Sequence, residues 1–221
     1  MTFLNDFLNF HRTLVKVNRK YFIIVFLTSI FLTNSLVFAG GFDFIDSSSE
    51  KDDGVIWQYH YDLPAYLTGI TVAGALWEGN ESRLGRTLWR STDALVISTV
   101  VTGALKYATT RVRPSKTDNP NQWFAGGEND SFPSGHVSSV TALVTPIILE
   151  YRNDTPWIFT LAAIPLYEAG GRVKVQAHWQ TDVLAGMAVG IIAGYCEYRF
   201  DSPIIFYVLP EGIYAGLKYR F

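Results

Sequence analysis

The feature of this sequence that most constrains its fold is a series of five apolar stretches free of charged residues, separated by polar segments. They cover residues 63–77, 94–105, 137–149, 156–167 and 183–196. None of them alternates apolar and polar residues with the period of two that is typical of a half-buried strand. We therefore predict that all five are helices. With the apolar N-terminal segment they indicate an all-α bundle of about six helices.

The lengths of these stretches leave two environments open. Each has 12 to 15 residues, fewer than the roughly 20 that a membrane-spanning helix needs, so they could form the core of a soluble exported bundle. Two features favour a membrane bundle. The last stretch extends back to residue 177 if His178 and Asp182 are functional polar residues. In addition, alternating helices place the basic segment 78–90, Arg152 and Arg199 on one side, as the positive-inside rule expects.

The N-terminal residues 1–39 are predicted to be a signal peptide or an N-terminal transmembrane anchor. Lys16, Arg19 and Lys20 precede the uncharged segment 21–39, which ends in the small-x-small pattern Val-Phe-Ala. The same segment is about long enough to cross a bilayer. Either alternative delivers the chain to the membrane and places the residues after 39 outside, which in a bacterium is the periplasm.

Three further regions follow. The acidic, serine-rich segment 40–61 is predicted to be an exposed linker, and residues 62–200 form the main domain. The tail 201–221 is predicted to be an accessory hairpin, with short strands on either side of the turn at 210–212. The net charge of −2 gives no indication of a nucleic-acid partner. Nothing in the sequence specifies an oligomeric state.

Three clusters of basic and small polar residues lie at the ends of the apolar stretches. They are 106–114, which closes the second stretch, 131–136, which precedes the third, and 171–182, between the fourth and fifth. If the helices alternate in direction, all three clusters fall on the same side of the bundle, which is also the side of the exported linker. The sequence therefore predicts one site built from three distant segments.

The side chains of these clusters suit a phosphate group. Lys106, Arg113 and Arg172 supply positive charge, and the planar guanidinium matches the oxygens of a phosphate. Ser134 and Gly135 are expected at a helix start, where free backbone N–H groups bind anions. No cluster of carboxylates suggests a metal site, so we expect no metal and no cofactor, with the three cations supplying the electrostatic stabilisation.

The same clusters contain two histidines and a carboxylate with catalytic spacing. His178 and Asp182 are four residues apart, and hence on one face of a helical turn. A carboxylate on one imidazole nitrogen fixes the tautomer and makes the other nitrogen a better nucleophile. His136 is then the candidate acid that protonates the leaving oxygen, and later the base that activates water.

The three clusters resemble the signature of the type 2 phosphatidic acid phosphatase (PAP2) family, which shares its core with vanadium haloperoxidases. That signature is Lys-x6-Arg-Pro, then Pro-Ser-Gly-His, then Ser-Arg-x5-His-x3-Asp. The first two motifs match in full at 106–114 and 133–136, and Arg172, His178 and Asp182 keep the spacing of the third. One position departs from it, because Gly171 stands where the family usually has serine. From the sequence alone we expect Gly171→Ser to be tolerated.

The resemblance implies a six-helix core with phosphate held by Lys106, Arg113, Ser134, Gly135 and Arg172. It also implies a metal-independent phosphatase with His178 as nucleophile, Asp182 as its partner and His136 as general acid. The expected partner is a phosphorylated lipid at a membrane, such as undecaprenyl diphosphate, phosphatidate, phosphatidylglycerol phosphate or lipid A. The expected location is the bacterial inner membrane, with the site facing the periplasm.

Three alternatives stay open at this point. The first is a soluble periplasmic acid phosphatase of broad specificity, released after signal cleavage. The second is a vanadate-dependent haloperoxidase, because the same residues hold vanadate. The third is an inactive homologue that binds lipid.

Overall fold

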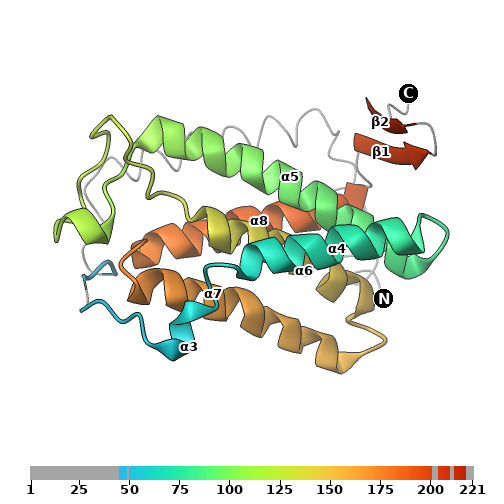
Figure 1. The fold of residues 1–221 in the computed structure, drawn as a ribbon, viewed down its shortest axis with the longest axis horizontal. Coiled ribbons are helices and arrows are strands. Elements are labelled where there is room, and N and C mark those ends of the chain that lie inside the picture. The colour runs from blue at the N-terminus through green and yellow to red at the C-terminus, as the bar shows by residue number, and fades with distance from the viewer. Residues whose placement is uncertain (1–44, 49, 201–203, 210–211, 218–221) are drawn as a thin grey trace, which may run out of the picture. The chain divides into compact units, whose positions relative to one another are not determined.

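The computed structural model describes residues 45–48, 50–200, 204–209 and 212–217 (Figure 1). The N-terminal segment 1–39, predicted to be a signal peptide or an anchor, lies outside the described residues. The described main domain is helical, as its apolar stretches predict. Its α-helices are α3 (Val55–Gln58), α4 (Leu63–Glu78), α5 (Arg83–Thr109), α6 (Gly135–Tyr151), α7 (Ala163–Lys174) and α8 (Gln180–Phe200), with 3-10 helices η1 (Pro114–Lys116) and η2 (Pro156–Ala162).

Two helices differ from their sequence prediction at the ends. Helix α5 begins well before its apolar stretch because Ser82 caps it, its hydroxyl accepting a hydrogen bond from the Gly85 amide at 2.9 Å. The fourth apolar stretch, 156–167, is divided between η2 and the start of α7. Hydrophobic patterning locates an apolar segment but does not show where its backbone changes from a 3-10 helix to an α-helix.

Helix α6 packs against α4, α5, α7 and α8, and α8 also contacts α5 and α7. Small residues allow the close approach of α6 and α8. A Cβ placed on Gly190 would lie 2.5 Å from the Ser138 carbonyl oxygen, and one on Gly186 would lie 2.6 Å from that of Ser134. Thr102 on α5 donates a hydrogen bond to Ser138 on α6 at 3.0 Å. The interior of the bundle is thus built largely from small and hydroxyl-bearing residues.

The segment that precedes α4 is mostly exposed, but it contacts the bundle. Asp46 and His60 are buried, although both fall in the region predicted to be an exposed linker. The Asp52 amide donates a hydrogen bond to the carbonyl of Lys174 at the end of α7, at 2.9 Å. The Asp46 carboxylate accepts a hydrogen bond from the Thr181 amide at the start of α8, and the His60 ring lies against Gly171 near the end of α7.

The C-terminal residues form a two-stranded antiparallel sheet of β1 (Ile204–Leu209) and β2 (Gly212–Leu217). The register pairs Ile204 with Leu217 and Leu209 with Gly212, so all six residues of each strand are paired. The sequence pattern of this tail also indicates two short strands about a turn.

Candidate active site

The three sequence clusters meet at one end of the bundle. The amide of Ser134, the N-cap of α6, donates a hydrogen bond to the carbonyl of Asp182 in the first turn of α8, at 2.9 Å. The Arg113 guanidinium, just before η1, donates one to the carbonyl of Ala177 at 3.2 Å. Lys106 lies in the last turn of α5, and Arg172 in the last turn of α7. The structure thus brings together the segments that helix alternation places on one side.

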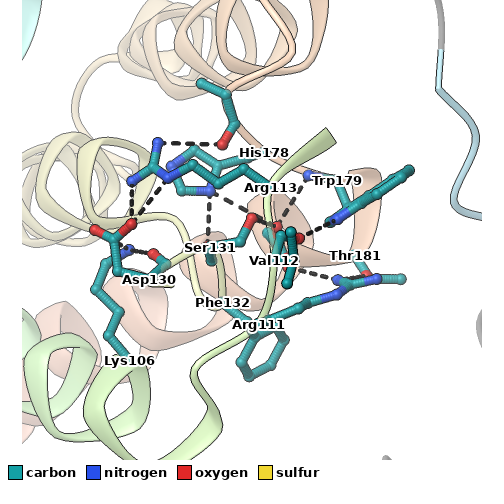
Figure 2. Close-up of polar contacts among 12 residues, drawn as sticks. Lys106, Arg111, Val112, Arg113, Asp130, Ser131, Phe132, His178, Trp179 and Thr181 are labelled. Atoms are coloured by element: carbon teal, nitrogen blue, oxygen red, sulfur yellow. Dashed lines mark hydrogen bonds and ion pairs between the residues drawn. The ribbon is translucent and has the colours of Figure 1, made fainter. Parts of the chain in front are cut away.

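His178 is buried and held in one orientation. Its Nδ1 lies 2.7 Å from the carbonyl oxygen of Ser131 (Figure 2). Because a carbonyl only accepts, Nδ1 must carry the proton, and Nε2 is then the nitrogen with a free lone pair. Burial lowers the pKa of His178 to about 4, although Asp182 opposes this shift, so the imidazole is neutral at pH 7.

Asp182 makes more contacts than its predicted role as the partner of His178 requires. Its Oδ2 lies 3.7 Å from Nδ1 of His178, an electrostatic contact, while the hydrogen bond at that nitrogen goes to Ser131. Oδ2 also accepts hydrogen bonds from the Ser131 hydroxyl at 2.5 Å and from the Trp179 amide at 2.9 Å. Asp182 therefore fixes the Ser131 loop and the start of α8 together, on either side of the histidine.

Arg111 is a site residue that sequence reasoning did not identify. It is fully buried and pairs with Asp182 at 2.5 Å and with Asp46 at 2.6 Å. It also donates to the Thr181 hydroxyl at 2.8 Å and lies over the Trp123 ring at 4.2 Å. Arg111 lies inside the 106–114 cluster, but no sequence signal distinguishes it from its basic neighbours. Its ion pairs link the pre-bundle segment to the first turn of α8.

Asp130 is a second residue that the sequence did not indicate. Figure 2 shows its carboxylate between the side chains of Lys106 and Arg113. The Arg113 guanidinium bonds Oδ1 of Asp130 at 2.8 and 2.9 Å, and the Lys106 ammonium lies 3.8 Å from Oδ2. Burial raises the pKa of Asp130, but the two cations lower it more, so the net shift is downward. The Asp130 carboxylate therefore competes with a bound anion for Lys106 and Arg113.

Two groups of the predicted phosphate cradle are buried without a hydrogen-bond partner. They are the Ser134 hydroxyl and Nε of Arg172. A Cβ placed on Gly135 would lie 3.7 Å from Cε of Lys106, so the lysine side chain passes close to the start of α6. His136 follows in the first turn, half-buried and close enough for the charges of Arg172 and His178 to act on it. Free donors and positive charge at a helix start make a suitable anion site.

Two more buried side chains lie close to Arg172. His60 and Glu168 are fully buried, and none of their side-chain nitrogens or oxygens has a hydrogen-bond partner. Within the part of the chain that the structure describes, no three His, Cys, Asp or Glu side chains are grouped in a way that could hold a metal ion.

The known proteins that this chain resembles point to one family. The family model described as the PAP2 superfamily matches residues 88–205. A lipid A 1-phosphatase of Porphyromonas gingivalis is 30% identical over 146 residues, which are 65% of this chain and 30% of that protein. An undecaprenyl-diphosphatase of Sulfolobus acidocaldarius is 28% identical over 111 residues, which are 49% of this chain and 52% of that protein.

The chain therefore spans about a third and about half of the length of these two relatives. Among solved structures, the crystal structure of LpxE from Aquifex aeolicus superposes with a TM-score of 0.51 and 17% sequence identity. The superposition covers 67% of this chain and 88% of that one. At this identity the likeness concerns the fold.

Proposed function

The chain belongs to the PAP2 superfamily, and from this premise we propose that it is a metal-independent phosphatase that forms a phosphohistidine on His178. The observation that carries the proposal is the fixed tautomer of that residue. Its Nδ1 proton is held by the Ser131 carbonyl at 2.7 Å, which leaves the Nε2 lone pair for attack on phosphorus. Burial keeps the imidazole neutral and therefore nucleophilic at pH 7.

The second part of the proposal concerns the phosphate. Lys106, Arg113 and Arg172 neutralise its charge, and Ser134 and Gly135 donate hydrogen bonds from the start of α6. The buried, unpartnered donors of Ser134 and Arg172 support this assignment, because a phosphate oxygen supplies the acceptors they lack. Fixed donors around a trigonal-bipyramidal phosphoryl group stabilise the charge that develops in the transition state.

The remaining roles concern proton transfer. In the proposed reaction, His136 starts as the imidazolium, a form that the negative charge of the bound phosphate favours. Nε2 of His178 then bonds to phosphorus while the ester oxygen leaves and takes a proton from His136. A water molecule then gives its proton back to His136 and attacks the phosphohistidine, which releases phosphate and restores Nε2. Asp182, 3.7 Å from Nδ1, stabilises the positive charge that the imidazole carries while it is phosphorylated.

We further propose that the substrate is a lipid phosphate or diphosphate. The two relatives are named for lipid A and for undecaprenyl diphosphate, and phosphatidate and phosphatidylglycerol phosphate offer the same phosphate chemistry. The surface of the bundle also supports a lipid partner. Large apolar side chains are more than half exposed on four helices, namely Tyr66, Ile70, Trp77, Val100, Tyr107, Leu166, Leu184 and Ile191.

The proposed location is the bacterial inner membrane, with the site facing the periplasm. By length and composition, α8 is the single described helix suited to crossing a bilayer. An apolar exterior around an interior of small and hydroxyl-bearing residues is typical of helix packing in membranes. Arg83, Arg152 and Arg199 lie at the helix ends opposite the site, the end that the positive-inside rule assigns to the cytoplasm.

The test is phosphate release from purified full-length protein in detergent micelles. The panel contains undecaprenyl diphosphate, phosphatidate, phosphatidylglycerol phosphate, lipid A and a soluble aryl phosphate, each with and without EDTA. We expect one or more of the lipids to be preferred by at least tenfold over the soluble ester, with no effect of EDTA. His178→Ala is expected to abolish release, whereas Lys116→Ala, which removes an exposed cation on η1, is expected to leave it unchanged.

Each part of the proposal has a result that contradicts it. Equal turnover of all esters, with active protein extracted without detergent, would indicate a soluble phosphatase of broad specificity. Strong inhibition by EDTA would contradict the metal-independent reaction. Full activity of His178→Ala would remove the proposed nucleophile.

A further inference from the structure

His60 is a histidine without an assigned role, and its surroundings are unusual. It lies in the turn between α3 and α4, is fully buried, and has no hydrogen-bond partner at either ring nitrogen. A neutral imidazole carries one donor and one acceptor, and leaving either buried without a partner destabilises the folded protein. Such a group in a folded protein calls for a physical explanation.

The ring of His60 fills the space beside Gly171, the residue just before Arg172. A Cβ placed on Gly171 would lie 2.6 Å from Cδ2 of His60, 2.8 Å from Cγ and 2.9 Å from Cβ. Since even the Cβ of His60 is in the way, a small rotation of the ring would not make room. The glycine that departs from the family's usual serine is therefore the position that admits the His60 ring.

The electrostatic environment of His60 is that of the proposed phosphate site. Burial and the nearby charge of Arg172 lower the pKa of His60 to about 4, so the ring is neutral at pH 7. Its charge, when present, also acts on His136. Nε of Arg172, the residue whose charge acts on His60, is a second buried donor without a partner. A phosphate oxygen against Arg172 is an acceptor for both an imidazole N–H and the guanidinium.

We propose that His60 is a further phosphate-binding residue, which donates an imidazole N–H to a phosphate oxygen beside Arg172 and takes the place of the side chain missing at position 171. This inference rests on the proposed phosphate site, but it requires neither a lipid substrate nor a particular leaving group. It gives this chain a neutral donor from the pre-bundle segment, in addition to the cations and the start of α6.

The experiment measures binding of inorganic phosphate to full-length protein by titration calorimetry. His60→Phe keeps an aromatic ring against Gly171 but removes both nitrogens, and His60→Asn keeps a donor. A hydrogen bond to a charged group contributes about 1.5–3 kcal/mol, so we expect the Kd for phosphate to rise about 10-fold or more in His60→Phe and less in His60→Asn. Unchanged thermal unfolding of His60→Phe would confirm that packing is retained.

Trp57→Phe provides a matched control. Trp57 packs on the neighbouring glycine, with its ring 3.2 Å from a Cβ placed on Gly170, and its indole N–H bonds Asp52 outside the site. This variant also removes an N–H from a ring against α7, yet we expect its Kd to stay within twofold of the wild-type value. An equal loss in both variants would overturn the proposal, since it would indicate a packing effect.

A second pair of variants keeps the proposal testable if His60→Phe does not fold. Gly171→Ser alone is expected to weaken phosphate binding, because the new Cβ displaces His60. Combining it with His60→Ala makes room for the serine, and we expect phosphate affinity above that of Gly171→Ser. A wild-type Kd in Gly171→Ser would contradict the proposal, as would a wild-type Kd in His60→Phe.

The outcomes also separate this inference from the proposed function. If phosphate binding depends on His60 but the protein hydrolyses no lipid, the proposed His60 contact is supported and the proposed lipid phosphatase activity is refuted. Lipid hydrolysis with a Kd that is unaffected in His60→Phe would refute the contact alone. No phosphate binding by the wild-type protein would refute both.

Discussion

Replacing Arg111 by methionine tests whether the buried ion pairs hold the site together. The guanidinium pairs with Asp46 at 2.6 Å and Asp182 at 2.5 Å, and all three side chains are at most 1% exposed. Methionine fills a similar volume but leaves both carboxylates without their cation. Removing one partner of a buried pair costs about 3–5 kcal/mol. The expected shift in the folding equilibrium is about 100-fold or more.

The assay is denaturant unfolding in detergent micelles, followed by tryptophan fluorescence, because Arg111 lies over the Trp123 and Trp179 rings. Arg113→Met is the control: this side chain is 24% exposed and its partner Asp130 is 50% exposed, so we expect a loss below about 1 kcal/mol. Adding Asp46→Asn to Arg111→Met removes one stranded charge and should restore part of the lost stability.

Two results would contradict this role of the buried ion pairs. If Arg111→Met were within about 1 kcal/mol of the wild-type protein, the buried pairs would not be a source of stability. If Asp46→Asn destabilised the Arg111→Met background further, the carboxylate would not be stranded there.

Three more predictions follow from the same geometry. Asp130→Asn removes an anion that shares the phosphate-binding cations, so the Kd for inorganic phosphate should fall, and an unchanged or higher Kd would contradict this. The pKa of His178 is about 4 against an ordinary 6.5, so its contribution to stability is fully present above pH 6.5 and lost toward pH 4. At pH 4.5 this loss should lower the free energy of unfolding by about 2–3 kcal/mol, as measured by denaturant unfolding. The same part of the pH dependence should be absent from His178→Gln. Gly190→Val should destabilise the protein by about 1–3 kcal/mol or more because it collides with α6, whereas Gly103→Ala, with open space around it, should not; equal melting temperatures would contradict this packing.

The sequence is sufficient to predict the cores of the long helices because each apolar stretch carries its own signal, whereas α3 and the start of α5 carry none. The apolar stretch 63–77 corresponds to α4 (Leu63–Glu78) almost residue for residue. The stretch 183–196 corresponds to α8 (Gln180–Phe200), whose first turn begins just before Asp182. Helix direction alone then predicts which helix ends meet, and therefore the convergence of the three clusters.

The contacts that the sequence did not predict are long-range ones. Arg111 pairs with Asp46 across 65 positions, and Asp130 lies 17 residues from Arg113. His60 meets Gly171 from a segment whose composition is that of an exposed linker. No periodicity or motif encodes such pairings, because they depend on how the pre-bundle segment and the loop between α5 and α6 pack against the finished bundle. The same contact argues against the expectation that Gly171→Ser is tolerated.

The phosphohistidine on His178, on which the proposed reaction depends, can be measured directly. Brief incubation with a ³²P-labelled lipid phosphate, followed by an alkaline quench, preserves an acid-labile phosphoramidate for peptide mapping by mass spectrometry. We expect label on the peptide containing His178, and we expect it to be lost on acid treatment and absent from His178→Ala. Rapid phosphate release without any label on His178, or label on His136 in its place, would contradict it.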